Sequence, residues 1–164
     1  MNRQVISILV DNQSGVLSRV AGLFSRRGYN IDSLSVGETE TANLSRMTIV
    51  ARGDDATLEQ IKKQLNKLVD VIRVISLASE ESVYRELVLL KVGAPSTNRA
   101  GISEIVDIFR AKIIDVASES MTVEITGDES KIKAFIELMQ PYGIKEIVRT
   151  GLTALQRGDR DIKH

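Results

Sequence analysis

Residues 5–24 read VISILVDNQSGVLSRVAGLF and contain a complete strand, turn and helix. The first six of these residues are an apolar run of strand length, and the turn formers of residues 11–15 stop it. Apolar side chains then recur at the spacing of one helix face, at Val16, Val20, Leu23 and Phe24. This stretch predicts a strand that leads through a tight turn into an amphipathic helix.

The remainder of the first half continues with two strands, a helix and a closing strand. Residues 31–36 and 44–51 have strand character and are joined by a short polar loop. Residues 71–77 form the closing strand. The helix before it has an apolar stripe at steps of three and four, made of Leu58, Ile61, Leu65 and Leu68. The predicted order is therefore βαββαβ.

The second half repeats this order. Its strands are predicted at residues 87–92, 113–116, 121–126 and 144–148, and its helices at residues 102–109 and 132–139. The expected fold is α+β, with two consecutive ferredoxin-like βαββαβ domains, each an antiparallel four-stranded sheet with two helices on one face. A polar stretch at residues 79–82 suggests a division into residues 1–79 and residues 80–164, the latter ending in a tail.

The composition argues against several classes of function. The 22 basic residues balance the 22 acidic ones, whereas proteins that bind nucleic acid through phosphates carry a basic excess. There is no cysteine, and the single histidine is the final residue, so a Ser-His or Cys-His nucleophile is not expected. No apolar run approaches the roughly 20 residues of a membrane span. We expect a cytoplasmic protein that is not an enzyme, holds no metal, and binds neither nucleic acid nor membrane.

The turn before the first predicted helix is the first candidate site. Amides that open a helix lack internal partners and lie at the positive end of the helix dipole, so they favour a carboxylate. Gly15 would let a ligand approach the backbone, and Asn12 offers an amide that both donates and accepts. The alternative is that these residues only form a turn and cap the helix.

A second candidate follows the same helix, at Gly28-Tyr29-Asn30-Ile31. Gly28 is suited to end the helix, and Asn30 could bind the amino or carboxyl group of a ligand. The alternative is an ordinary turn from helix to strand.

Residues 12–31, which begin with Asn12-Gln13-Ser14-Gly15-Val16-Leu17, resemble the opening of the acetolactate synthase small subunit, a signature of its ACT domain. Residues 44–49, 64–71 and 85–92 are similar to later parts of the same family. In the second half, residues 109–116, Arg149-Thr150-Gly151 and the tail at residues 154–158 also match. The resemblance covers essentially the whole chain in order.

This resemblance implies a ligand site between two copies of the chain. ACT domains of this family pair side by side as a homodimer, and valine binds in the dimer interface. The residues that the resemblance assigns to valine on one protomer are Asn12, Gly15, Val16 and Leu17, and those on the partner are Asn30 and Ile31.

The resemblance also implies the function: a non-catalytic regulatory subunit of acetolactate synthase in branched-chain amino acid biosynthesis. Such a subunit binds the catalytic large subunit, raises its activity and confers valine feedback inhibition. Thiamine diphosphate, magnesium and FAD are expected on the large subunit, and no cofactor is expected in this chain. The alternative function is a stand-alone amino-acid-sensing ACT regulator that acts on another target.

Overall fold

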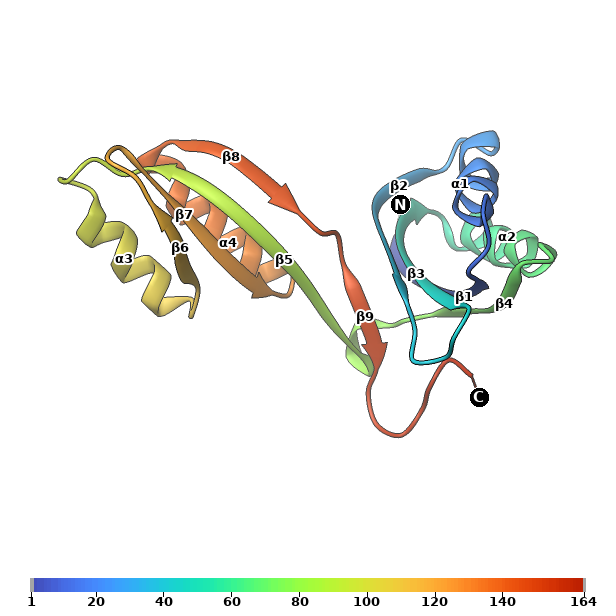
Figure 1. The fold of residues 1–164 in the computed structure, drawn as a ribbon. Helices are drawn as coiled ribbons and strands as arrows, with labels where there is room; N and C mark the ends of the chain where they lie inside the picture. Colours follow the sequence, from blue (N-terminus) through green and yellow to red (C-terminus); the bar gives the residue numbers. More distant parts are fainter. Residues whose placement is uncertain (1, 164) are drawn as a thin grey trace. The chain divides into compact units, whose positions relative to one another are not determined.

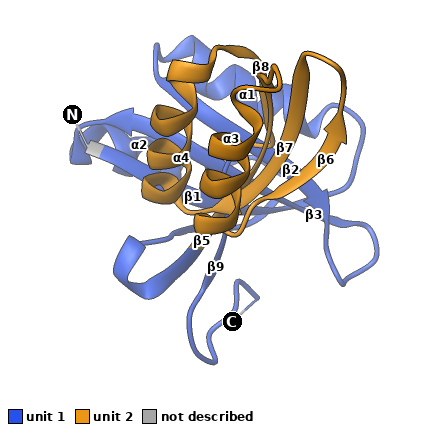
Figure 2. Ribbon diagram, turned by 90° about the vertical axis from the view of Figure 1, so that its left-hand side faces the viewer, with its two compact units in different colours: residues 1–83, 152–164 blue, residues 84–151 orange. Residues whose placement is uncertain are grey.

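The computed structural model describes residues 2–163 and divides them into two compact units (Figures 1 and 2). One unit comprises residues 1–83 with residues 152–164, and the other comprises residues 84–151. Both units have the predicted βαββαβ order. No helix within residues 2–163 is long and apolar enough to cross a membrane.

The first unit is a four-stranded antiparallel sheet in the order β2-β3-β1-β4, with two helices on one face. Its elements are β1 (Asn2–Asp11), α1 (Val16–Arg26), β2 (Asn30–Glu38), β3 (Leu44–Gly53), α2 (Asp55–Asn66) and β4 (Val71–Ser76). In the central pair, Ile6 lies opposite Ile49 and Ile8 lies opposite Met47. These four side chains form the centre of the core beneath the helices.

The second unit repeats this sheet in the order β6-β7-β5-β8, and β9, which belongs to the tail grouped with the first unit, pairs with β5. The elements of the second half are η1 (Ser79–Glu81), β5 (Ser82–Gly93), α3 (Arg99–Ile108), β6 (Lys112–Val116), β7 (Ser120–Gly127), α4 (Glu129–Met139), η2 (Gln140–Tyr142), β8 (Ile144–Arg149) and β9 (Thr153–Gln156). The predicted fold class is confirmed, and β9 is the one strand that the sequence patterns did not indicate.

The second helix of each unit begins in the same way. Asp54 accepts a hydrogen bond from the Thr57 N–H at 2.7 Å, and Asp128 accepts one from the Lys131 N–H at 2.9 Å. These bonds cap α2 and α4 and hold the pKa of each carboxyl below its usual value, because they favour the charged form. The helix that follows the candidate turn, α1, has glycine at this position instead.

The tail belongs to the first compact unit, whereas the sequence-based division placed it with the second domain. Leu152 donates its N–H to Ser33 Oγ at 2.9 Å, and its carbonyl accepts from Ser35 Oγ at 3.0 Å. Near the end of the tail, Lys163 lies 2.9 Å from Glu40. This contact lowers the pKa of the Glu40 carboxyl and raises that of the Lys163 ammonium. The tail thus packs on its own chain.

The tail lies over the face of the first sheet that carries no helices. Ser33 and Ser35 pair with Val50 and Thr48, so all four belong to this face. Val50 and Thr48 are buried, although no helix covers them. The buried side chains that the tail contributes are Leu152, Ala154 and Ile162.

Arg46 lies on this same helix-free face, opposite Leu9. Its Nε donates to Ser7 Oγ at 2.6 Å. Partial burial lowers the pKa of the Arg46 guanidinium, while the nearby Glu40 carboxylate raises it. Arg46 is thus half-buried and bonded to the central strand.

Candidate functional site

The turn between β1 and α1 places an open helix end at the surface. Gly15 is the N-cap residue and adopts a left-handed conformation, with φ of 86°. It has no side chain to cap the helix, and the first amide of α1, that of Val16, donates a long hydrogen bond of 3.4 Å to the Gln13 carbonyl. Asn12 is exposed, and its backbone N–H donates to the Asn43 carbonyl at 2.7 Å. The Asn12 side chain does not cap α1. Formation of a turn accounts for the hydrogen bond of the Asn12 backbone, but it gives the side-chain amide of Asn12 no role.

The two residues after Gly15 have different surroundings. Val16 is buried in the core of the first unit, and Leu17 is 46% exposed. The backbone N–H groups that open α1 thus lie beside one exposed aliphatic side chain. This arrangement suits a small molecule with a carboxylate and an apolar side chain.

A cation that the sequence analysis missed lies beside this helix end. Arg19 Nε donates to Asp70 Oδ2 at 2.8 Å, and a Cβ added to Gly15 would lie 3.1 Å from Arg19 Nη1. The arginine therefore lies beside the amides, with its charge balanced by Asp70. Arg19 and Asp70 are 51 positions apart, so no local sequence pattern could have indicated the pair.

Asn30 and Ile31 begin β2 at the other end of the sheet. Asn30 Nδ2 donates to Asp32 Oδ1 at 2.7 Å, and Asn30 remains exposed. Ile31 is half-buried and packs against the core of the first unit. The same carboxylate, Asp32, also accepts from Arg52 Nε at 2.5 Å.

Within one chain the two predicted halves of the site are far apart. Asp11, just before Asn12, lies opposite Leu44 in the register of β1 and β3, whereas Asn30 lies opposite Arg52. Leu44 and Arg52 are eight positions apart in one strand, which is about 26 Å of extended chain at ~3.3 Å per residue. The structure therefore brings Asn12 together with Gly15, Val16 and Leu17, but it does not bring Asn30 or Ile31 to them.

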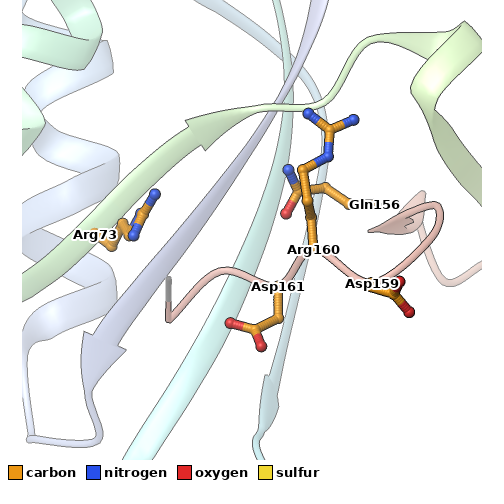
Figure 3. Close-up of a pocket in the computed structure, with 5 residues that line it drawn as sticks. All are labelled: Arg73, Gln156, Asp159, Arg160 and Asp161. Carbon is orange, nitrogen blue, oxygen red and sulfur yellow. The ribbon is translucent and has the colours of Figure 1, made fainter.

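A separate pocket lies between β4 and the tail (Figure 3). It is lined by Arg73, Gln156, Asp159, Arg160 and Asp161, so two cations accompany two carboxylates. None of the six predicted ligand residues lines it. Within the part of the chain that the structure describes, no group of three or more His, Asp or Glu side chains could hold a metal ion.

Comparison with known proteins places the chain in a family. A family model described as the AHAS small subunit-like ACT domain matches residues 6–73, and one described as the small subunit of acetolactate synthase matches residues 85–158. The probable acetolactate synthase small subunit of Methanothermobacter thermautotrophicus is 56% identical over 157 residues, which span 95% of this chain and 94% of that protein. The chain belongs to the acetolactate synthase small-subunit family.

Other members of this family are similar over the same length. The acetolactate synthase small subunit of Mycolicibacterium smegmatis is 51% identical over 157 residues, covering 96% of this chain and 92% of that protein. The crystal structure of the acetolactate synthase small subunit from Thermotoga maritima has a TM-score of 0.90 at 46% identity, covering 98% of this chain and all of that one. The first unit is thus an ACT domain, and membership of a small-subunit family supports a regulatory role.

Proposed function

We propose that this chain binds the catalytic large subunit of acetolactate synthase, raises its activity and makes it sensitive to valine. Two copies would pair through their ACT units as a homodimer, and valine would bind between them. Thiamine diphosphate, magnesium and FAD would be held by the large subunit, where acetolactate is formed. These assignments follow the family, and the geometry of the first unit supports one of them, the valine site shared between two copies.

The observation that carries the proposal is the separation of the two half-sites. The helix end at Gly15 offers amides for a carboxylate, and Asn30 offers an amide about 26 Å of strand away. Residues this far apart on one sheet bind one small amino acid only if a second copy supplies one half. A site shared between two copies couples the ligand directly to the way in which the copies pair.

This coupling gives valine a route to the catalytic subunit. Valine would stabilise the dimer arrangement in which Asn12 of one copy and Asn30 of the other both contact it. Inhibition then requires that the large subunit has a different affinity, or a different activity, with this arrangement than with the free one. Exposed Leu17 and half-buried Ile31 would contact the aliphatic side chain. Such contacts discriminate one methylene by only about 1–3 kcal/mol.

The first test is acetolactate formation by the cognate large subunit, with and without this chain, while valine is titrated. We expect higher activity with the chain, and inhibition by valine only when the chain is present. If adding this chain changes neither the rate of the large subunit nor its inhibition by valine, the proposal is contradicted. A stand-alone regulator with another target is then favoured.

The variant Gly15→Asp tests where the carboxylate binds. It places a negative charge at the opening amides of α1, beside the position that we assign to the ligand carboxylate. Loss of charge-assisted hydrogen bonds of ~1.5–3 kcal/mol predicts valine binding weaker by at least about ten-fold in calorimetry. Valine inhibition should disappear while stimulation of the large subunit persists.

Gly143→Asp is the matched control, because Gly143 has the same φ of 86° and lies in the second unit. Its ψ of 96° lies outside the left-handed region in which Gly15 lies with a ψ of −5°, so the variant imposes at least as much backbone strain without placing charge at α1, and it should leave valine binding unchanged. If Gly15→Asp binds valine as tightly as Gly143→Asp does, the ligand carboxylate does not lie at this helix end.

A further inference from the structure

The edge strand β6 of the second unit carries a run of exposed apolar side chains. All five residues of Lys112–Val116 are exposed, with exposed fractions of 37% for Ile113, 49% for Ile114 and 56% for Val116. Ile108, at the end of the neighbouring α3, is 68% exposed. β6 is the last strand of its sheet, so within residues 2–163 one side of its backbone has no strand beside it (Figure 2). An apolar edge of this kind is a template for another strand.

A β-bulge in β6 determines which of its side chains share a face. Lys112 lies opposite Glu124, and Asp115 lies opposite Thr122. Glu124 and Thr122 are two positions apart in β7 and therefore point to the same face. Lys112 and Asp115 consequently also share a face, although they are three positions apart, because the register shifts between Ile113 and Asp115.

We propose that β6 pairs antiparallel with β6 of a second copy of this chain. A two-fold axis perpendicular to the sheet would pass between Ile113 and Ile114, so that each Lys112 faces Asp115 of the other copy. The exposed isoleucines of the two copies then lie opposite each other between the two ion pairs. Because Lys112 and Asp115 share a face, this pairing makes one continuous sheet with all helices on the same side.

Charge complementarity selects this register. A shift by one residue would place Lys112 opposite Val116 and leave both charged side chains without an opposite partner. In the proposed register the strand is complementary to itself at both ends, and no like charges meet. The pairing involves the second unit alone and is independent of the valine site in the first.

The test uses interchain disulfides, because the chain contains no cysteine. Full-length Lys112→Cys and Asp115→Cys chains are mixed under mild oxidation. We expect a disulfide-linked dimer that contains one chain of each kind. Either variant alone should link poorly, because its two cysteines would be about 10 Å apart along the strands, beyond the ~7 Å limit for Cα atoms in a disulfide. The mixed dimer also keeps its second Lys112–Asp115 pair intact.

A second mixture, of Ile113→Cys and Ile114→Cys chains, retains both charged residues and should link in the same way. A mixture of Lys145→Cys and Glu146→Cys chains, on the opposite edge strand β8, measures nonspecific oxidation. The proposal is overturned if both β6 mixtures link no more than this control. It is also overturned if Lys112→Cys or Asp115→Cys alone links as well as their mixture does, because the strands would then meet in another register.

Discussion

The turn before α1 and the turn before α3 occupy the same place in the repeated βαββαβ order, and their backbones are held alike. In the first unit the Asn12 N–H donates to the Asn43 carbonyl at 2.7 Å; in the second the Ala94 N–H donates to the Glu119 carbonyl at 2.9 Å. Each bond joins the turn to the loop between the next two strands. The side chains differ: exposed Asn12 carries an amide, whereas Ala94 is fully buried and carries none.

Side chains of the second unit lie close to the start of α3. Arg99, the first residue of α3, donates from Nε to the Ala94 carbonyl at 2.9 Å and from Nη2 to the Ser118 carbonyl at 2.8 Å. A Cβ at Gly101 would collide with the Tyr142 hydroxyl, so the helix is packed closely against that ring. Both helices begin without a side-chain cap. They differ in what lies beside them: Arg99 and Tyr142 at the start of α3, and Arg19, bonded to Asp70, at the start of α1.

The helix-free faces of the two sheets differ in a similar way. In the first unit the tail covers this face, and Thr48 and Val50 beneath it are buried. In the second unit the corresponding face carries Lys91, paired in register with Glu146, and Leu89, paired with Glu124 and with Val148, which is 59% exposed. Both faces therefore combine polar and apolar side chains, and the tail covers the face of the first unit.

The largest expected effect concerns this cover. Leu152→Ala removes a side chain that is only 7% exposed, and should cost about 2–4 kcal/mol of unfolding free energy in urea titrations. Leu155→Ala, three residues further along the tail in β9, is the matched control, because Leu155 is 61% exposed and its loss should change stability by less than about 0.5 kcal/mol. Equal stability of the two variants would mean that the tail does not pack on the first unit.

A smaller effect on stability is expected when a helix glycine is replaced by alanine. The replacement should destabilise the second unit and stabilise the first. Gly101→Ala in α3 should destabilise the protein by about 1–3 kcal/mol through its clash with Tyr142. Adding Tyr142→Phe removes the hydroxyl and should restore part of this loss. Gly22→Ala in α1 meets only the end of Arg26 at 3.4 Å, so helix propensity should stabilise the protein by about 0.5–1 kcal/mol. Thermal unfolding measures both; equal signs would contradict the difference in packing.

The smallest effect concerns a feature that the two units share, the aspartate cap of the second helix. The pKa of Asp128 is lowered in the folded chain, chiefly by its hydrogen bond from the Lys131 N–H. Its charged form therefore stabilises the fold above the unfolded pKa of ~3.9, and this contribution is lost as the pH falls through the folded pKa.

Asp128→Asn keeps an acceptor but not the charge, so it should lower Tm by about 1–3 °C at pH 6 and by almost nothing near pH 2. Asp54 titrates in both proteins and so cancels in the difference between their melting temperatures. A Tm difference that is constant across this pH range would contradict a role for the ionised carboxylate.

The sequence predicted most of the fold because long apolar patterns determine it. The stripe of Leu58, Ile61 and Leu65 has helical spacing and is buried as predicted. The sequence patterns did not indicate β9, because its alternation spans only four residues, Thr153–Gln156, within a tail rich in charged residues. The sequence did carry a signal that the helix-free face is covered. The central strand β1 is apolar without alternation, which is typical of strands buried on both faces.

The candidate site was predictable only in part. Gly15 and Asn12 stand out because turn residues precede an apolar helix, and the structure places them together at the helix end. Arg19 could not be placed there from sequence, because its position depends on distant Asp70. That Asn30 lies at the far end of the sheet follows from strand register, which local patterns do not give. The assignment of all six residues to valine stays a prediction.

The return of the tail to the first unit has a consequence for synthesis on the ribosome. Residues 1–83 emerge first, but the tail from residue 152 that completes their unit emerges only after the whole of residues 84–151. Until the tail has emerged, the helix-free face of the nascent first unit lacks its cover. We therefore expect chains truncated before residue 152 to be prone to aggregation, and chaperones that bind apolar surface to recognise this intermediate.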